Sequence, residues 1–287
     1  MPDGRTFPTI APLVARALEL HSSAKILQYG RSRGFPPLCE AAAPWLRSLT
    51  VDVESPQDIL ITSGSQSALS AVGRVFLEQP DEIVALESPT YLGALDAFGE
   101  RHPQYVIVES DADGMDPESL DRVLSQYPVK FVYTVSDFHN PAGTTIPLNR
   151  RIAIADVLMR HRVLMVEDSP YRQLRYEGEH VRTIQSLAPN NVIFMTTLSK
   201  LLAPGLRTGL TVAPRQVLER MINVNGWRTL CGSTFDQAIA AVYIGEGHLD
   251  AHVPEIVNLY KPRRDAMVAA LEAYFPEGWS WVTPPGG

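Results

Sequence analysis

The sequence predicts an α/β fold with a mostly parallel central sheet. From about residue 58 onward, short apolar runs alternate with amphipathic stretches, which is the order expected when each strand is followed by a covering helix. The apolar runs are continuous and do not alternate with polar residues, as is typical of strands covered on both faces. With 287 residues, 45% of them hydrophobic, the chain can form one large core, or a large domain and part of a smaller one.

Residues 1–28 predict a helix with loose flanks. Pro12 suits its first turn. Its apolar face would be supplied by Leu13, Ala17, Leu18 and Leu20. Strands are then expected at 59–61, 83–86, 105–108, 131–135, 163–166, 192–195 and 209–213. Helices are expected between most of them, at 65–78, 90–100, 116–126, 148–161 and 214–224. This alternation implies a sheet flanked by helices.

Beyond about residue 230 the pattern becomes helical. Helices are expected at 235–244 and 249–274, and the second should be kinked or broken near Pro254 and Pro262, because proline removes a helical hydrogen bond. A last strand is expected at 278–282, where two tryptophans lie in Gly-Trp-Ser-Trp-Val.

Charge and cysteine content exclude several classes of protein. The formal net charge is −7 and no block of Lys and Arg stands out, which argues against a nucleic-acid or anionic-membrane partner. The two cysteines, Cys39 and Cys231, provide no disulfide framework and fit a reducing compartment. The start of the chain lacks the regions of a signal peptide, and no apolar stretch is long enough to span a bilayer. A cytoplasmic location is therefore expected by default.

The segment 196–209 carries the strongest chemical signal. It reads Thr-Thr-Leu-Ser-Lys-Leu-Leu-Ala-Pro-Gly-Leu-Arg-Thr-Gly and places Lys200 just after the apolar run 192–195. Two hydroxyls and a guanidinium lie near this lysine in the sequence, on Thr197, Ser199 and Arg207. An amine can form a Schiff base with an aldehyde, while hydroxyls and a guanidinium hold a phosphate. The segment predicts a site for a phosphorylated aldehyde; the alternative is an ordinary surface loop.

Other polar residues follow other predicted strands, where open α/β sheets bind their ligands. Ser65 and Gln66 open a helix, so free backbone N–H groups there could hold an anion, although Ser65 could also be a simple N-cap. Asn140 could contact a ligand or close an Asx turn before Pro141. Tyr91 could stack on a flat cofactor or belong to the core.

Asp168 ends a strongly apolar strand, so its carboxylate should be partly buried and in need of a partner. A pyridinium nitrogen would be a natural one, and the alternative is a helix or turn cap. Tyr171 could donate its phenol to a ligand oxygen or simply pack. His248 and His252 have the spacing of metal ligands, but no third ligand is evident and no metal site is expected. His139 stays unassigned.

Segment 196–209 resembles the cofactor-lysine signature of class I/II aminotransferases, which are fold-type I enzymes that use pyridoxal phosphate. The other motifs follow the family's order along nearly the whole chain, and the branch resembled includes 2-aminoadipate and kynurenine aminotransferases and the aminotransferase-like domains of certain bacterial regulators. The resemblance implies a large cofactor-binding α/β domain at 58–230. Residues 1–57 would form an N-terminal segment and interface loop, and 231–287 the linking helices and the start of an incomplete small α+β domain.

The resemblance also implies roles for the site residues. Lys200 would bind the cofactor as a Schiff base, and Asp168 would keep the pyridine nitrogen protonated. Asn140 and Tyr171 would contact the phenolic oxygen of the ring, and Tyr91 would stack on the ring. The phosphate-binding positions are matched by Ser65, Gln66, Thr197, Ser199 and Arg207. Tyr29 matches a tyrosine that reaches the phosphate of the neighbouring subunit, which implies a homodimer.

The function implied is transfer of an amino group between an amino acid and a 2-oxo acid, with Lys200 also moving the proton of the substrate Cα. The alternatives are a non-catalytic cofactor-binding sensor of a transcription regulator, or a lyase or decarboxylase. A regulator should carry a basic N-terminal DNA-binding domain, and none precedes Met1.

The sequence departs from the family in having Ala142 where threonine is usual and Thr197 where serine is common. Family members also continue past 284–287, so the chain is expected to be a weakly active fragment without the arginine that clamps the substrate carboxylate.

Overall fold

The computed structural model describes residues 3–287 and has a seven-stranded sheet at its centre, in the order β1-β9-β8-β7-β6-β2-β3. Its strands are β1 (Ile59–Ser63), β2 (Ile83–Glu87), β3 (Gln104–Val108), β6 (Val129–Thr134), β7 (Leu164–Asp168), β8 (Val192–Thr197) and β9 (Thr208–Val212). The neighbours from β3 to β8 pair in parallel, whereas β9 runs antiparallel to both β1 and β8. The predicted mostly parallel α/β fold is confirmed, and each predicted strand of this sheet is present.

Two layers of helices cover the sheet, because side chains alternate between its faces. In β6, Phe131 and Tyr133 face one apolar layer and Val132 faces the other. The first layer contains α4 (Ser65–Phe76), α5 (Leu92–Gly99) and α9 (Arg215–Thr229). The second contains α6 (Pro117–Gln126), α7 (Leu148–His161) and α8 (Ile184–Leu187). β8 lies between them and is buried along its whole length, as its continuous apolar run predicts.

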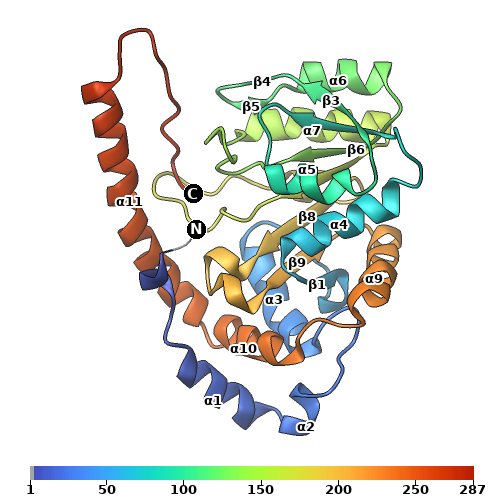
Figure 1. Ribbon diagram of the computed structural model, residues 1–287, viewed down its shortest axis with the longest axis vertical. Helices are drawn as coiled ribbons and strands as arrows, with labels where there is room; N and C mark the ends of the chain where they lie inside the picture. The colour runs from blue at the N-terminus through green and yellow to red at the C-terminus, as the bar shows by residue number, and fades with distance from the viewer. Residues whose placement is uncertain (1–2) are drawn as a thin grey trace.

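A further helical group packs against the β1–β9 end of the sheet (Figure 1). It comprises α1 (Ile10–Leu20), α2 (Ser23–Ile26), α3 (Pro36–Ser48), α10 (Thr234–Gly245) and the first part of α11 (His248–Tyr274). Only part of the predicted apolar face of α1 is correct: Leu13 and Ala17 are buried, but Leu18 and Leu20 are exposed. The sequence interpretation missed α3, whose run of small residues and three prolines obscures its helical period.

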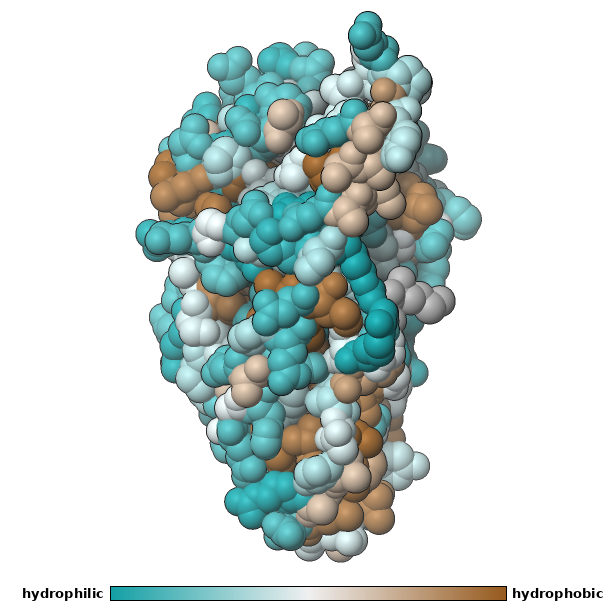
Figure 2. All heavy atoms as spheres, turned by 90° about the vertical axis from the view of Figure 1, so that its left-hand side faces the viewer, coloured by the Kyte–Doolittle hydropathy of each residue, from teal (hydrophilic) through white to brown (hydrophobic). Residues whose placement is uncertain are grey.

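Two expectations for the C-terminal part are wrong or incomplete. The helix α11 continues through Pro254 and Pro262 without the expected break, since each proline removes a single hydrogen bond while the remaining ladder persists. Residues 278–282 form no strand, because the chain there packs Trp279 and Trp281 edge-on against Phe275 and pairs with no other strand in the described residues. Figure 1 shows this segment turning back beside α11. Figure 2 shows the side of the molecule on which α11 lies, with hydrophobic side chains scattered among hydrophilic ones.

The remaining elements are short connections. They are the hairpin of β4 (Ser110–Asp111) and β5 (Gly114–Met115), and the 3₁₀ turns η1 (Gly4–Thr6), η2 (Pro56–Asp58), η3 (Leu198–Lys200) and η4 (Pro204–Leu206). The C-terminal residues are tied to the segment after β7 through hydrogen bonds from Tyr176 N to Pro285 O, 2.8 Å, and from Gly287 N to Leu174 O, 2.8 Å. Across residues 3–287, we find no helix with the length and apolarity needed to cross a membrane.

Candidate active site

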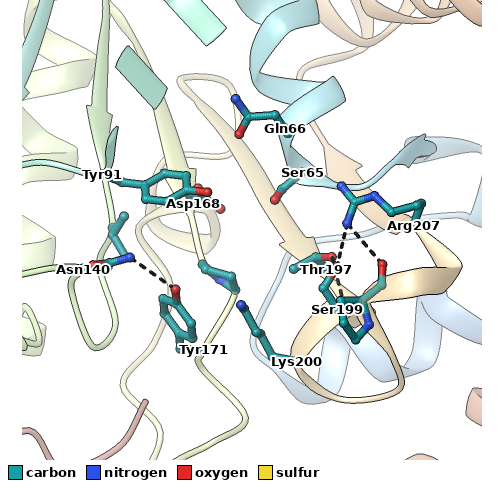
Figure 3. Close-up of a pocket in the computed structure, with 13 residues that line it drawn as sticks. Ser65, Gln66, Tyr91, Asn140, Asp168, Tyr171, Thr197, Ser199, Lys200 and Arg207 are labelled. Carbon is teal, nitrogen blue, oxygen red and sulfur yellow. Dashed lines mark hydrogen bonds between the residues drawn. The ribbon is translucent and has the colours of Figure 1, made fainter. Parts of the chain in front are cut away.

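One pocket at the ends of β1, β6, β7 and β8 collects almost all of the predicted site residues (Figure 3). Its lining includes Ser65, Gln66, Tyr91, Asn140, Asp168, Tyr171, Thr197, Ser199, Lys200 and Arg207. Tyr29 does not line the pocket: it lies in a loop of the helical group and is 77% exposed. Strand ends that are far apart in the sequence therefore meet at one place, as expected for an open α/β sheet.

Lys200 reaches the pocket from η3, the turn that directly follows β8. Its Nζ lies 5.7 Å from the centroid of the Tyr171 ring. Burial, and secondly the positive charge of Arg207, lower the pKa of the Lys200 amine. A lowered pKa increases the fraction of neutral amine, which is the form that attacks a carbonyl carbon.

A cradle for an anion lies in the part of the pocket where α4 begins, next to Arg207. Gly64 is the N-cap of α4 with φ +80, and a Cβ there would collide with the Arg207 guanidinium, so the position requires glycine. The guanidinium lies 3.5 Å from Ser199 Oγ (Nη1) and 3.4 Å from the Ser63 carbonyl oxygen (Nη2). Backbone N–H groups at a helix N-terminus, next to an arginine and hydroxyls, favour a phosphate.

The side chains of Thr197 and Gln66, both predicted to bind the phosphate, are hydrogen-bonded to backbone groups of the protein. The Thr197 hydroxyl lies 2.9 Å from the Thr208 carbonyl oxygen and accepts a hydrogen bond from Ser199 N, so it caps η3. The Gln66 side chain donates to the Gly93 carbonyl oxygen at 2.6 Å. Gln66 would therefore offer its backbone N–H to an anion, while its side chain holds the start of α5.

Asp168 is a buried carboxyl with one unpaired oxygen, an arrangement that suits a cationic partner. It ends β7, is 2% exposed, and its Oδ2 accepts a hydrogen bond from Tyr133 Oη at 3.0 Å. Its Oδ1 is buried and has no hydrogen-bond partner among the described residues. Burial raises the pKa of Asp168 to about 7, and the Tyr133 hydrogen bond acts in the opposite direction. A protonated ring nitrogen placed against Oδ1 would satisfy this orphaned atom, so the site fits pyridoxal phosphate.

Asn140, Tyr171 and Tyr91 complete the pocket around Asp168 (Figure 3). Asn140 Nδ2 donates to Tyr171 Oη at 3.5 Å, so the two side chains converge on the same region. Burial raises the pKa of Tyr171, while the Asn140 hydrogen bond opposes that shift. Tyr91 is the N-cap residue of α5 and is partly buried. Tyr91, Asp168 and the Asn140–Tyr171 pair therefore line the same cavity as Lys200.

Sequence reasoning missed two residues that support the site from behind. Tyr133 reads as an ordinary core aromatic, and nothing local signals its bond to Asp168. Glu87 ends the apolar strand β2, which is the same signal that selected Asp168, and its carboxyl faces His139, Nε2 to Oε2 3.6 Å. His139 Nε2 itself has no hydrogen-bond partner among the described residues, and His139 does not line the pocket.

Comparison with known proteins places this geometry in a family. The family model "Aminotransferase class I and II" matches residues 2–287. The chain is 41% identical over 295 residues to aromatic-amino-acid aminotransferase 1 of Thermococcus litoralis, covering 100% of this chain and 70% of that protein. The solved multiple substrate aminotransferase from Thermococcus profundus superposes with a TM-score of 0.95 at 41% identity, covering 100% of this chain and 73% of that one.

The α-aminoadipate aminotransferase of Thermus thermophilus, solved with N-(5'-phosphopyridoxyl)-L-leucine, superposes with a TM-score of 0.91 at 30% identity. The match covers 100% of this chain and 73% of that one. The resemblance deduced from the motifs, including its 2-aminoadipate branch, is therefore confirmed.

Proposed function

The chain belongs to the class I and II aminotransferases, and from this we propose that it binds pyridoxal phosphate in the pocket around Lys200 and transfers an amino group between an amino acid and a 2-oxo acid. One observation carries the proposal: an amine, a buried carboxylate with an unpaired oxygen and an arginine-lined cradle face the same pocket. In this proposal residues 58–230 form the cofactor-binding unit, flanked by 1–57 and 231–287.

Each pocket residue has a task that follows from its position. The Arg207 guanidinium, the Ser65 and Ser199 hydroxyls and the N-terminus of α4 hold the phosphate. Asp168 keeps the ring nitrogen protonated through Oδ1. Asn140 and Tyr171 would donate hydrogen bonds to the phenolic oxygen, and Tyr91 would stack on the ring. Bound pyridoxal phosphate supplies an aldehyde that reacts with amines and a ring that accepts electrons.

Lys200 acts twice. Its neutral amine, which the lowered pKa favours, would hold the cofactor through the aldehyde carbon, the aldehyde oxygen leaving as water. When the amine of an amino acid takes that place, the free Lys200 amine would accept the proton of the substrate Cα and give it back, acting as a general base and then as a general acid.

We also propose that the protein works as a homodimer, with Tyr29 contacting the phosphate held by the partner subunit. Tyr29 lies outside its own pocket, and two further large apolar side chains near it in the same surface are exposed, Trp227 by 84% and Leu230 by 56%. The loop that carries Tyr29 is fixed to that surface by a hydrogen bond from Ser32 Oγ to Leu230 O at 3.0 Å. Exposed aromatic surface of this kind is typical of an interface.

The direct test is to mix the purified protein with pyridoxal phosphate and reduce it with borohydride. The cofactor should become fixed to the peptide that contains Lys200. Label on another lysine, or none, would show that Lys200 is not the cofactor lysine. Amino acids should then be tested in a panel with 2-oxoglutarate and pyruvate as acceptors. Fixation at Lys200 without turnover of any pair would favour a cofactor-binding role without catalysis.

A further inference from the structure

Tyr133 brings a hydroxyl to the site through the interior of the protein. It lies in β6, next to β7, and its side chain is fully buried within the apolar layer between the sheet, α4 and α5. Its Oη donates to Asp168 Oδ2 at 3.0 Å, the only hydrogen bond that this hydroxyl makes in residues 3–287. Tyr133 does not line the pocket. A phenol in an apolar layer needs a partner, and this one is Asp168.

Aromatic packing fixes the position of this phenol. The Phe98 ring meets the Tyr133 ring edge-on, with centroids 5.7 Å apart and an interplanar angle of 76°. Phe98 in turn packs edge-on against Phe131, with centroids 5.0 Å apart. All three side chains are fully buried. Because the rings interlock in a close-packed core, the Tyr133 hydroxyl has little freedom to leave Asp168.

The two oxygens of Asp168 consequently differ. Oδ2 is held by Tyr133, while Oδ1 is buried and unpaired among the described residues. With one oxygen anchored to the neighbouring strand, rotation of the carboxylate is restricted and the other oxygen is left for a ligand. The donated hydrogen bond also stabilises the charged form of the carboxyl in an environment that otherwise disfavours it.

We propose that Tyr133 is a positioning residue for Asp168: its phenol anchors Oδ2 and keeps the group a carboxylate, so that Oδ1 meets the ring nitrogen of the bound cofactor and leaves the proton on that nitrogen. This inference rests on the proposed binding of pyridoxal phosphate. If the hydrogen bond is lost, Asp168 becomes more basic and less well oriented. The shared proton then moves from the ring nitrogen toward the carboxyl.

The experiment compares Tyr133→Phe with Tyr105→Phe. Both changes remove one phenolic oxygen and keep the ring. Tyr105, on β3, donates to the Leu95 carbonyl oxygen at 3.3 Å and lies outside the pocket lining. Each protein is loaded with pyridoxal phosphate that carries ¹⁵N in the ring, and the ¹⁵N chemical shift reports how far the ring nitrogen is protonated. Cofactor affinity and Tm are measured on the same samples.

For Tyr133→Phe we expect the ¹⁵N shift to move toward the value of neutral pyridine and kcat to fall about tenfold, equivalent to about one pKa unit. Cofactor affinity should change less than threefold because the phosphate cradle is untouched. Tyr105→Phe should match the parent protein in all of these measurements. A fluorinated tyrosine at position 133, whose phenol is a stronger donor, should move the ¹⁵N shift in the opposite direction.

The outcomes separate this inference from the proposed function. A parent protein that binds no cofactor would refute the proposed function itself. A parent protein with a protonated ring nitrogen, together with a Tyr133→Phe protein that has the same ¹⁵N shift and kcat, would overturn only the role of Tyr133. If Tyr133→Phe does not fold, the fluorinated protein decides: an unchanged ¹⁵N shift there overturns the role as well.

Discussion

The imidazole of His139 and the carboxyl of Glu87 face each other in the interior, with Nε2 and Oε2 3.6 Å apart and both side chains buried. His139 Nδ1 accepts a hydrogen bond from Ala142 N at 3.3 Å, so the ring proton belongs on Nε2 and points toward Glu87. The His139 backbone carbonyl also accepts from Gly143 N at 2.6 Å. The loop that carries Asn140 into the pocket is therefore held by two hydrogen bonds to His139.

Glu87→Gln should stabilise the protein more at pH 8 than at pH 5. Burial raises the pKa of Glu87 from 4.5 to about 7, so the folded state favours the protonated carboxyl. That contribution is fully present below pH 4.5 and is lost as the pH rises through 7. Glutamine is neutral throughout, so its advantage should grow across this window, by up to about 3 kcal/mol.

Urea unfolding at the two pH values measures this difference, and the exposed Glu78 supplies a control, Glu78→Gln. An advantage that stays the same at both pH values, or that shrinks at pH 8, would show that Glu87 is ionised in the folded protein. Burial lowers the pKa of His139 to about 4, so its own contribution runs the other way, being present above pH 6.5 and lost toward pH 4. This His139 contribution is the same in the parent protein and in Glu87→Gln, so it cancels when their stabilities are compared.

Asp168→Ala should reduce turnover far more than cofactor occupancy. The groups proposed to hold the phosphate are Arg207, its neighbour Ser199 and the start of α4, so binding should persist, while the ring loses the carboxylate that keeps its nitrogen protonated. We expect kcat to fall roughly a hundredfold or more, as for other groups that stabilise charge in a transition state. The measurement is kcat under saturating cofactor together with a cofactor titration. Near-normal turnover would contradict the role of Asp168 in holding the ring proton.

The strands, and the residues that directly follow them, could be predicted because both are marked by patterns within a short stretch of sequence. Continuous apolar runs mark buried strands, and the residues after them, such as Asp168 and Lys200, must lie at the sheet edge. Residues 278–282 also have the local pattern of a strand but do not form one. A strand needs a partner strand, and a single segment of sequence does not show whether a partner is present.

The supporting contacts behind the site could not be predicted because they join residues distant in sequence. Tyr133 and Asp168 are separated by 35 positions, and only the register of β6 against β7 brings them together. The close approach of Glu87 Oε2 to His139 Nε2 likewise depends on β2 lying next to β6. Such contacts follow from strand order, which the alternation of strands and helices leaves open.

Arg207→Gln should weaken cofactor binding by about tenfold to a hundredfold, because a charge-assisted contact to the phosphate is lost. It should also raise the pKa of Lys200, since the positive charge of Arg207 is one of the two causes that lower it. Cofactor titration and the pH dependence of cofactor attachment measure these effects separately. Arg220→Gln, which changes an exposed arginine on α9, is the matched control. Equal affinities in the two variants would place the phosphate elsewhere.

Mixing the Tyr29→Ala protein with the Lys200→Ala protein tests whether Tyr29 contacts the cofactor in the partner subunit. In a mixed dimer of Tyr29→Ala and Lys200→Ala subunits, the pocket that keeps Lys200 would receive the intact Tyr29 of the other chain. If subunits exchange freely, half of the dimers are mixed, and about a quarter of the pockets should regain normal affinity. Borohydride fixation at low cofactor concentration counts these pockets without relying on turnover.

If Tyr29 acted within its own chain, every pocket with Lys200 would still lack it and the mixture would fix no more cofactor than Tyr29→Ala alone. Sedimentation that shows only monomer with cofactor bound would equally contradict the shared site, since Tyr29 lies too far out on its own subunit to line its own pocket.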